Sequence, residues 1–102
     1  MTKGENLNIC VMEGCGELIQ AVSKVTRFGK DNHHPDAIQK TNEEDLIRKY
    51  YQLQAVVEMV FEKEGLRRIS EQEIDHIKKV KKRSVNHYSN YSKDLGIVVD
   101  PD

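Results

Sequence analysis

Apolar residues recur every three or four positions over the first part of the chain, between residues 5 and 28. This spacing places them on one face of a helix. The expected stripe consists of Leu7, Val11, Cys15, Leu18, Val22 and Val25. Gly29 follows the last apolar residue, a common position for the end of a helix. The polar stretch 29–41 has no periodicity and contains Pro35. The pattern therefore predicts a helix over about 5–28 and a loop over 29–41.

A second helix is predicted over 42–64. Thr41 and Glu44 have the spacing of a capping box, and acidic residues fill the first turn, where they favour the positive end of a helix. Apolar residues again recur in steps of three and four, and Gly65 follows them. We expect the whole stripe, Tyr50 included, to lie in the core: Leu46, Tyr50, Leu53, Val57 and Val60.

A third helix is predicted over 71–94, because Ser70 and Glu73 repeat the capping-box spacing. Its apolar stripe is weaker and comprises Ile74, Ile77, Val80 or Lys81, Val85, Tyr88 and Tyr91. Gly96 closes the helix, and a short tail, 97–102, follows. Three helices predict an all-α fold in a single domain, residues 1–102. The core is thin for this length, so we expect further copies to complete the bundle as a homo-oligomer.

Composition narrows the class of protein. The chain of 102 residues has 16 Lys and Arg against 17 Asp and Glu, a formal net charge of −1. This balance argues against general nucleic-acid binding, which favours an excess of positive charge. No apolar run is long enough to cross a bilayer, and the segment MTKGENLN does not resemble a signal peptide. Cys10 and Cys15 are poorly spaced for a disulfide on a helix, so we expect a reduced, cytoplasmic protein without a membrane partner.

A polar stripe accompanies the apolar stripe on the first helix. It consists of Glu13, Glu17, Gln20, Lys24 and Arg27, again in steps of four and three. One interpretation is a solvated helix face with charge pairs. The other is a site whose acidic end holds a divalent cation and whose basic end holds phosphates. Gly14 and Gly16 interrupt the helix at a cost of about 1 kcal/mol each, which indicates that the space is needed.

The segment EGCGELIQAVSKVTRFG resembles the first helix of the MazG-like, all-α nucleotide pyrophosphohydrolases, particularly the short versions found in phages. Members of that family read E-E-C-x-E-x-I-Q-A-x-S-K-x-x-R-F-G at this place. The resemblance continues through NHHPD, the loop ending in KTN, and KVKKRSVNHYSNYSKDLG, and so covers nearly the whole chain. It implies a helical bundle that hydrolyses a nucleoside triphosphate to monophosphate and pyrophosphate with magnesium ions.

The resemblance also implies where the metal ligands would lie. The family's E-x-x-E on the first helix falls on Gly14 and Glu17, and its E-x-x-D on the second helix falls on Lys49 and Gln52. Only Glu17 is a carboxylate, and Glu13 is retained one turn earlier. Magnesium needs anionic oxygen ligands, and a lysine ammonium repels it. We therefore expect no metal cofactor, with Mg²⁺ present only if Glu13 and Glu17 form a rearranged site.

These substitutions favour a catalytically degenerate protein that binds a nucleotide, or a nucleotide-derived signal such as a cyclic nucleotide, without hydrolysing it. Fixed cations would replace the metal's charge without generating a nucleophile. The residues assigned to the nucleotide and its phosphates are Gln20, Ser23, Lys24, Arg27, Arg48, Lys49 and Gln52. Possible base or sugar contacts are Asn32, His34 and Tyr51, and a neighbouring subunit would supply Lys81 or Arg83.

The family context extends this hypothesis to a phage-encoded protein that sequesters a host signalling nucleotide in the host cytoplasm. Two alternatives stay open. One is an active, Mg²⁺-dependent nucleoside triphosphate pyrophosphohydrolase whose catalytic carboxylates are Glu13 and Glu17. The other is a protein-interaction module that inhibits a host factor.

Overall fold

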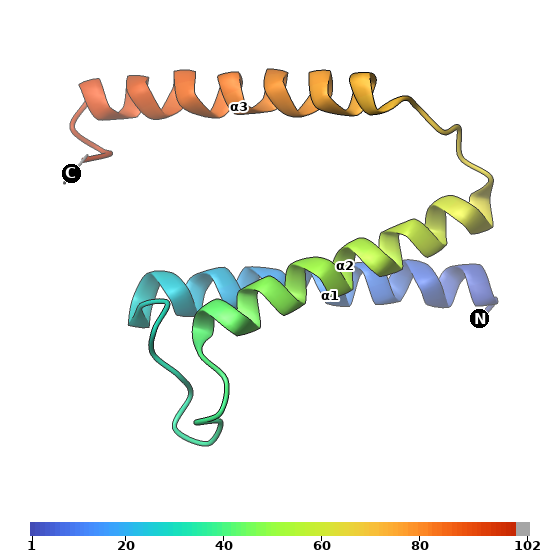
Figure 1. The fold of residues 1–102 in the computed structure, drawn as a ribbon, viewed down its shortest axis with the longest axis horizontal. Coiled ribbons are helices and arrows are strands. Elements are labelled where there is room, and N and C mark those ends of the chain that lie inside the picture. Colours follow the sequence, from blue (N-terminus) through green and yellow to red (C-terminus); the bar gives the residue numbers. More distant parts are fainter. Residues whose placement is uncertain (100–102) are drawn as a thin grey trace. The chain divides into compact units, whose positions relative to one another are not determined.

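The computed structural model describes residues 1–99 and contains three helices in this range (Figure 1). They are α1 (Lys3–Phe28), α2 (Asn42–Glu64) and α3 (Glu71–Asp94). The described residues form no strand, only an isolated antiparallel bridge between His33 and Thr41. The prediction of an all-α fold is confirmed, and the helix bounds agree with the sequence pattern to within two residues. Residues 100–102 of the expected tail lie outside the described residues.

Short polar residues begin all three helices, as the sequence pattern indicates for the second and third. Thr41 Oγ1 accepts a hydrogen bond from the Glu44 N–H (3.2 Å), and Ser70 Oγ accepts one from the Glu73 N–H (3.1 Å). Thr2 forms a complete capping box with Glu5, which explains why α1 begins at Lys3 instead of near residue 5.

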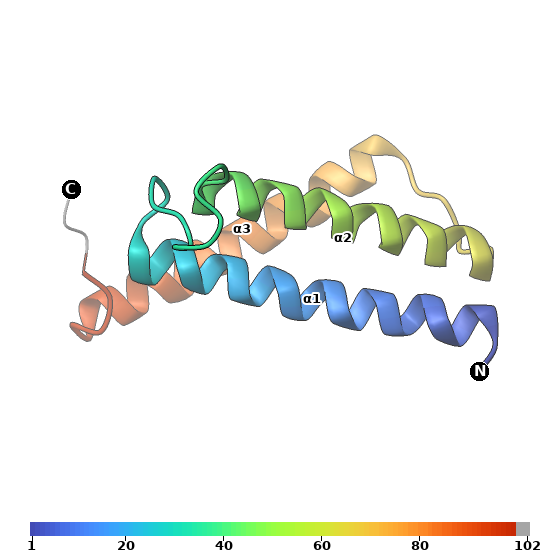
Figure 2. The ribbon, with the colours of Figure 1, turned by 90° about the horizontal axis from the view of Figure 1, so that it is seen from below.

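The chain divides into two compact units, one comprising Met1–Leu66 and one beginning at Arg67. In the first unit α1 and α2 run antiparallel and pack side by side (Figure 2). In the second unit, none of the described residues of α3 is buried, and its apolar positions are exposed by between 37% at Ile74 and 65% at Tyr88. No helix of the described chain is long and apolar enough to traverse a membrane. The single domain expected over 1–102 stays a prediction.

The line along which α1 meets α2 differs from the expected stripe. It passes through Gly4, Leu7, Val11, Gly14, Leu18, Ala21 and Val25, of which Ala21 is only 1% exposed. Cys15 and Val22, which we expected on this line, are exposed. The reason is close approach of the two helices: a Cβ atom built on Gly14 would lie 3.1 Å from Leu53 Cδ1. Small residues at 14 and 21 let the helices meet there.

The corresponding line on α2 confirms most of the predicted stripe and corrects one residue. Leu46, Leu53, Val57 and Val60 are half-buried, as expected. Tyr50 is 48% exposed, so its placement in the core is wrong. The contact line passes instead through its neighbour, Lys49, one residue and about 100° away around the helix.

The loop between α1 and α2 is closed at its base. The backbone N–H groups of Asn42 and Glu43 donate to the carbonyls of Asn32 (2.8 Å) and Lys30 (2.9 Å). The buried side chain of Asn42, 6% exposed, donates through Nδ2 to the Gly29 carbonyl at 2.9 Å. These bonds hold the two helix ends together and fix the position of α2 against α1.

Candidate functional site

A hollow of about 210 Å³ lies between α1 and α2. All four positions that the resemblance equates with metal-ligand positions line it, together with Glu13. The full lining is Cys10, Glu13, Gly14 and Glu17 from α1 and Lys49, Gln52, Leu53 and Val56 from α2. We call this hollow the interhelical pocket. It gathers the acidic end of the polar stripe on α1 with the middle of α2.

An ion pair lies in the interhelical pocket. Lys49 Nζ is 3.4 Å from Glu17 Oε2, and the side chains are 26% and 51% exposed. A pair with this exposure contributes between 0 and about 1 kcal/mol to stability, because water screens it. Glu13 lines the same pocket, and the Lys49 ammonium is paired with Glu17. Within residues 1–99, no three His, Cys, Asp or Glu side chains gather in a way that could hold a metal ion.

The two glycines of α1 differ in their surroundings. Gly14 faces Leu53 at the close approach of the helices, so a larger side chain there must displace Leu53. A Cβ atom on Gly16 would meet nothing within 4 Å. The space that the sequence indicates is therefore needed at Gly14, for packing, and not at Gly16.

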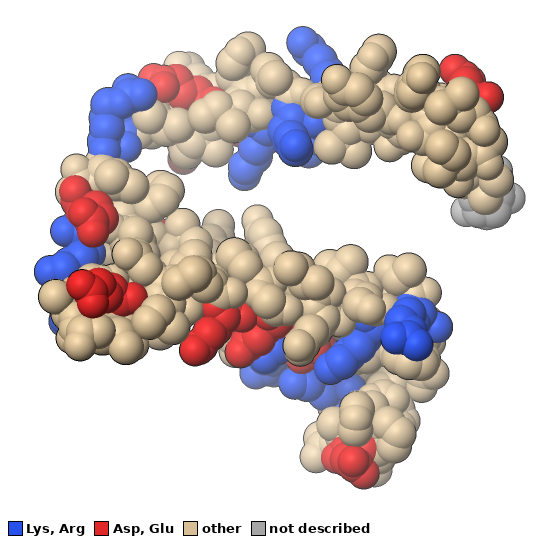
Figure 3. All heavy atoms as spheres, turned by 180° about the vertical axis from the view of Figure 1, so that it is seen from behind, with Lys and Arg blue, Asp and Glu red and all other residues tan. Residues whose placement is uncertain are grey.

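The basic end of the polar stripe lies outside the interhelical pocket. Gln20, Ser23, Lys24 and Arg27 follow Glu17 along α1, and Lys24 is the only half-buried one among them. The Arg27 guanidinium lies over the ring of Phe28, 5.4 Å from its centroid. On the surface drawn in Figure 3, acidic and basic side chains of the first unit lie next to each other and do not form separate patches.

Arg48 lines a different hollow from its neighbour Lys49. This second hollow, of about 450 Å³, lies between the loop and the start of α2 and is lined by Asp36, Ala37, Gln39, Lys40, Glu44 and Arg48. We call it the loop pocket. Lys40 is paired with the buried carboxylate of Asp45 at 3.0 Å. Glu44, Arg48 and Gln52 follow one another at four-residue steps, so the loop pocket and the interhelical pocket succeed each other along one side of α2.

Comparison of the chain with protein-family models, with curated proteins and with solved structures found no match.

The expected base or sugar contacts line neither pocket. Asn32 Oδ1 accepts from the His33 N–H (2.9 Å), and His34 Nδ1 accepts from the Asp36 N–H (3.1 Å). Both side chains therefore stabilise the loop itself. Tyr51 is 60% exposed and lies edge-on against the ring of Tyr50, with centroids 5.0 Å apart.

Lys81 and Arg83 lie in α3 and are exposed within the second unit. Their assignment to a neighbouring subunit's site stays a prediction.

Sequence reasoning missed several residues that line the two pockets. Cys10 and Val56 lie one turn from Glu13 or Gly14 and from Gln52, so helical spacing alone was enough to find them. The loop-pocket residues Asp36, Gln39 and Lys40 carried no such signal, because a loop of irregular conformation has no period to read.

Proposed function

We propose that the protein binds a nucleotide or a nucleotide-derived signal and leaves it intact, as a MazG-like protein whose metal site has been lost. One observation carries this proposal: the ammonium of Lys49 lies 3.4 Å from Glu17, in the pocket that gathers the positions equated with metal ligands. A lysine there supplies positive charge for a phosphate, but it does not bind and activate a water as a metal ion does.

The register of α2 supports the same interpretation. Shifting the comparison of the second helix by one residue would equate a ligand position with Arg48 or Tyr51, and neither lines the interhelical pocket. Lys49 and Gln52 both do. Neither of these two side chains is a carboxylate, so the arrangement favours loss of metal-assisted hydrolysis.

Phosphate binding would require Lys49 to exchange partners. The ammonium is now paired with Glu17, and a phosphate must take that place. Breaking the ion pair itself costs at most about 1 kcal/mol, because the pair is partly exposed and water screens it. Further donors and cations of the first unit that belong to this proposal are Gln20, Ser23, Lys24, Arg27, Arg48 and Gln52. The same proposal includes base or sugar contacts from Asn32, His34 or Tyr51. It also includes phosphate contacts from Lys81 or Arg83 of a neighbouring subunit.

Such a protein would sequester its ligand. In a phage-encoded chain acting in the host cytoplasm, the ligand would be a host signalling nucleotide. Binding without turnover would lower the free concentration of that nucleotide. Assembly into a homo-oligomer, which would complete the thin helical bundle, is part of this proposal.

Titration calorimetry with a panel of nucleotides and cyclic dinucleotides, with and without Mg²⁺, tests the proposal. We expect binding of at least one ligand without Mg²⁺, and at least a tenfold loss of affinity in Lys49→Gln. The matched control is Lys30→Gln, which removes another partly exposed ion pair, Lys30 with Glu43 at 3.8 Å, outside both pockets. Absence of binding to every ligand, or binding that needs Mg²⁺, would contradict the proposal.

The active pyrophosphohydrolase is the second candidate, because Glu13 and Glu17 both line the interhelical pocket. Release of pyrophosphate from a nucleoside triphosphate, lost in Glu17→Ala, would establish this activity in place of the binding protein. A host factor captured by a protein with no nucleotide affinity would instead favour the interaction module.

A further inference from the structure

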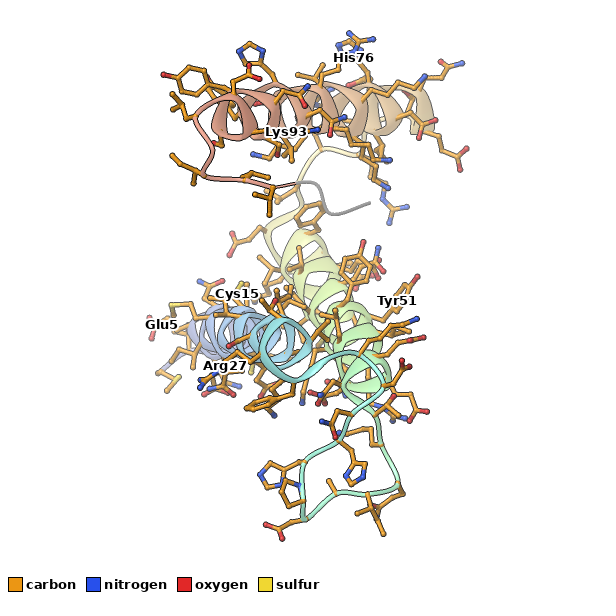
Figure 4. The ribbon with its side chains drawn as sticks, turned by 90° about the vertical axis from the view of Figure 1, so that its left-hand side faces the viewer. Glu5, Cys15, Arg27, Tyr51, His76 and Lys93 are labelled. Carbon is orange, nitrogen blue, oxygen red and sulfur yellow. The ribbon has the colours of Figure 1, made fainter. Side chains whose placement is uncertain are left out.

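Cations gather at the middle of α3. Within residues 78–83 lie Lys78, Lys79, Lys81, Lys82 and Arg83. No Asp or Glu occurs from His76 to Lys93, the two residues labelled on α3 in Figure 4. The last three of the five cations therefore have no carboxylate three or four residues away, the spacing at which side chains pair along a helix. Their charge is not balanced within α3, so it is available to a partner.

One face of α3 has the spacing of a helix that packs against another helix. Residues along this face recur in alternating steps of three and four, the spacing of a coiled-coil contact line. They are Ile74, Ile77, Lys81, Ser84, Tyr88 and Tyr91. We call this line the α3 seam. Its apolar members are exposed by between 37% at Ile74 and 65% at Tyr88, and none of the described residues of α3 is buried.

Lys81 is the charged residue of the α3 seam. Apolar seam residues lie on either side of it along the helix, Ile77 before and Tyr88 after. A helix packed along the seam would therefore cover the aliphatic part of Lys81 and bring the ammonium against whatever residue faces it. Covering an ammonium without a partner is costly, whereas a carboxylate opposite it forms a charge-assisted hydrogen bond. A single polar residue on such a line selects the partner and the register of the two helices.

We propose that the α3 seam docks another protein through an acidic amphipathic helix. The partner helix would have an apolar stripe that packs on the seam and carboxylates opposite Lys81 and beside it, where Lys78 borders the seam. Charge complementarity carries this proposal, because the cations at the middle of α3 have no carboxylates of their own to pair with. A contact along one helix face is small, so we expect micromolar affinity, with the charges setting specificity and association rate.

A second copy of α3 does not fit this surface. The cations lie near the middle of Glu71–Asp94. Two copies paired over their full length would therefore bring the two groups of cations to within about one helical turn of each other, in a parallel or an antiparallel arrangement. Like charges at facing positions repel, which disfavours pairing of α3 with itself. A partner of opposite charge does not meet this repulsion.

An anionic lipid surface and a nucleic acid also fit less well. Helices that lie on a membrane place Trp, Phe or Leu on the face that enters the lipid. The α3 seam has Lys81 and two tyrosines there and none of those three residue types. A nucleic acid would pair its phosphates with the cations, but it would leave the apolar residues of the seam exposed. An acidic amphipathic helix of a protein uses both features.

Binding of a designed peptide to the full chain tests the proposal. The probe has the sequence of residues 71–94 with glutamate in place of Lys78, Lys81, Lys82 and Arg83. A side-chain lactam between Asp75 and Lys79, away from the seam, holds the probe in a helix. The matched control peptide has the same lactam and glutamine at the substituted positions. In calorimetry we expect the glutamate peptide to bind about tenfold or more tightly than the glutamine peptide, with an affinity that falls as salt is added.

Two variants of the chain distinguish a contact on the seam from general electrostatic attraction. Lys81→Glu and Lys79→Glu change the net charge equally, but Lys79 lies about 160° around the helix from Lys81. We expect Lys81→Glu to lower the affinity for the glutamate peptide about tenfold or more, and Lys79→Glu to lower it about threefold or less. None of the described residues of α3 is buried, so neither substitution removes a packed side chain, and circular dichroism should show equal helix content.

All these measurements are made without nucleotide, so their outcome does not depend on the proposed function, in which Lys81 also has a role. Hydrogen exchange at the amides of α3 should slow when the glutamate peptide is added. Absence of binding, equal affinity for the two peptides, equal losses in the two variants, or unchanged exchange in α3 would overturn the proposal. Binding to vesicles of phosphatidylglycerol and phosphatidylcholine, or to a single-stranded oligonucleotide, in place of the peptide would overturn it in favour of a lipid or nucleic-acid surface.

Discussion

The two glycines of α1 offer the sharpest test of how α1 and α2 pack. Replacing Gly16 with alanine adds a methyl group that meets nothing within 4 Å. Alanine is favoured over glycine in a helix interior by about 1 kcal/mol, and nothing opposes that gain here. We expect Gly16→Ala to raise the free energy of unfolding by about 1 kcal/mol and the melting temperature by roughly 4–8 °C for a chain of this size.

Gly14→Ala makes the same chemical change in a different place. The added methyl would lie 3.1 Å from Leu53 Cδ1 and 3.8 Å from Leu53 Cβ. Forcing an extra methyl into a packed contact costs about 1–3 kcal/mol, which cancels or exceeds the propensity gain. We expect Gly14→Ala to be less stable than Gly16→Ala by about 1–3 kcal/mol, measured by thermal and urea unfolding at equal protein concentration.

A double-mutant cycle assigns the difference to Leu53. In a Leu53→Ala background the obstructing methyl is absent, so adding alanine at position 14 should become as favourable as at position 16, with a coupling energy of about 1–3 kcal/mol. Equal stabilisation by Gly14→Ala and Gly16→Ala in the otherwise wild-type chain would refute the close approach at this point.

Two further changes test the pocket and the loop. The double substitution Lys49→Glu with Gln52→Asp adds two carboxylates beside Glu17. We expect the melting temperature of this variant to rise with added Mg²⁺, whereas that of the wild type should not change. An equal response of the two proteins would contradict the role given to Lys49. Asn42→Ala removes the donor to the Gly29 carbonyl at the base of the loop. The change should lower the free energy of unfolding by about 0.5–1.5 kcal/mol, measured with urea, and should speed hydrogen exchange at the loop base. The exposed Asn8→Ala should cost nothing, and unchanged exchange in Asn42→Ala would show that the side chain does not close the loop.

The limits of the hydrophobic pattern are clearest in α1. Two lines of residues along α1 fit the spacing of three and four: one passes through Gly14 and Ala21, the other through Cys15 and Val22. Periodicity alone therefore does not distinguish them. The prediction took positions 15 and 22, because their apolar side chains are larger than those at 14 and 21. In the structure α2 packs on Gly14 and Ala21 instead, because the close approach of the two helices favours the smaller residues. Helix bounds, by contrast, depend on local caps and stops, and the sequence pattern identified these at the start of α2 and α3 and at the end of α1 and α2, but not the Thr2 cap of α1.

The interhelical pocket was more accessible to sequence reasoning than the loop pocket. Positions one turn apart on a helix must share a face, so Glu13 and Glu17 were bound to lie together, and the resemblance supplied their partners on α2. The separation of Arg48 from Lys49 into different hollows needed the position of the loop. That position follows from hydrogen bonds of Asn42 and Glu43, which no periodic pattern encodes.

The closed base of the loop has a consequence for how the chain tolerates change. Since Asn42 and Glu43 fasten the helix ends directly to Gly29, Lys30 and Asn32, the residues between them do not hold α1 and α2 in place. Lengthening a loop whose ends are already fixed costs little conformational entropy. Insertions between Pro35 and Ile38 should therefore reshape the loop pocket while the interhelical pocket stays as it is, so the two hollows are free to diverge independently in sequence.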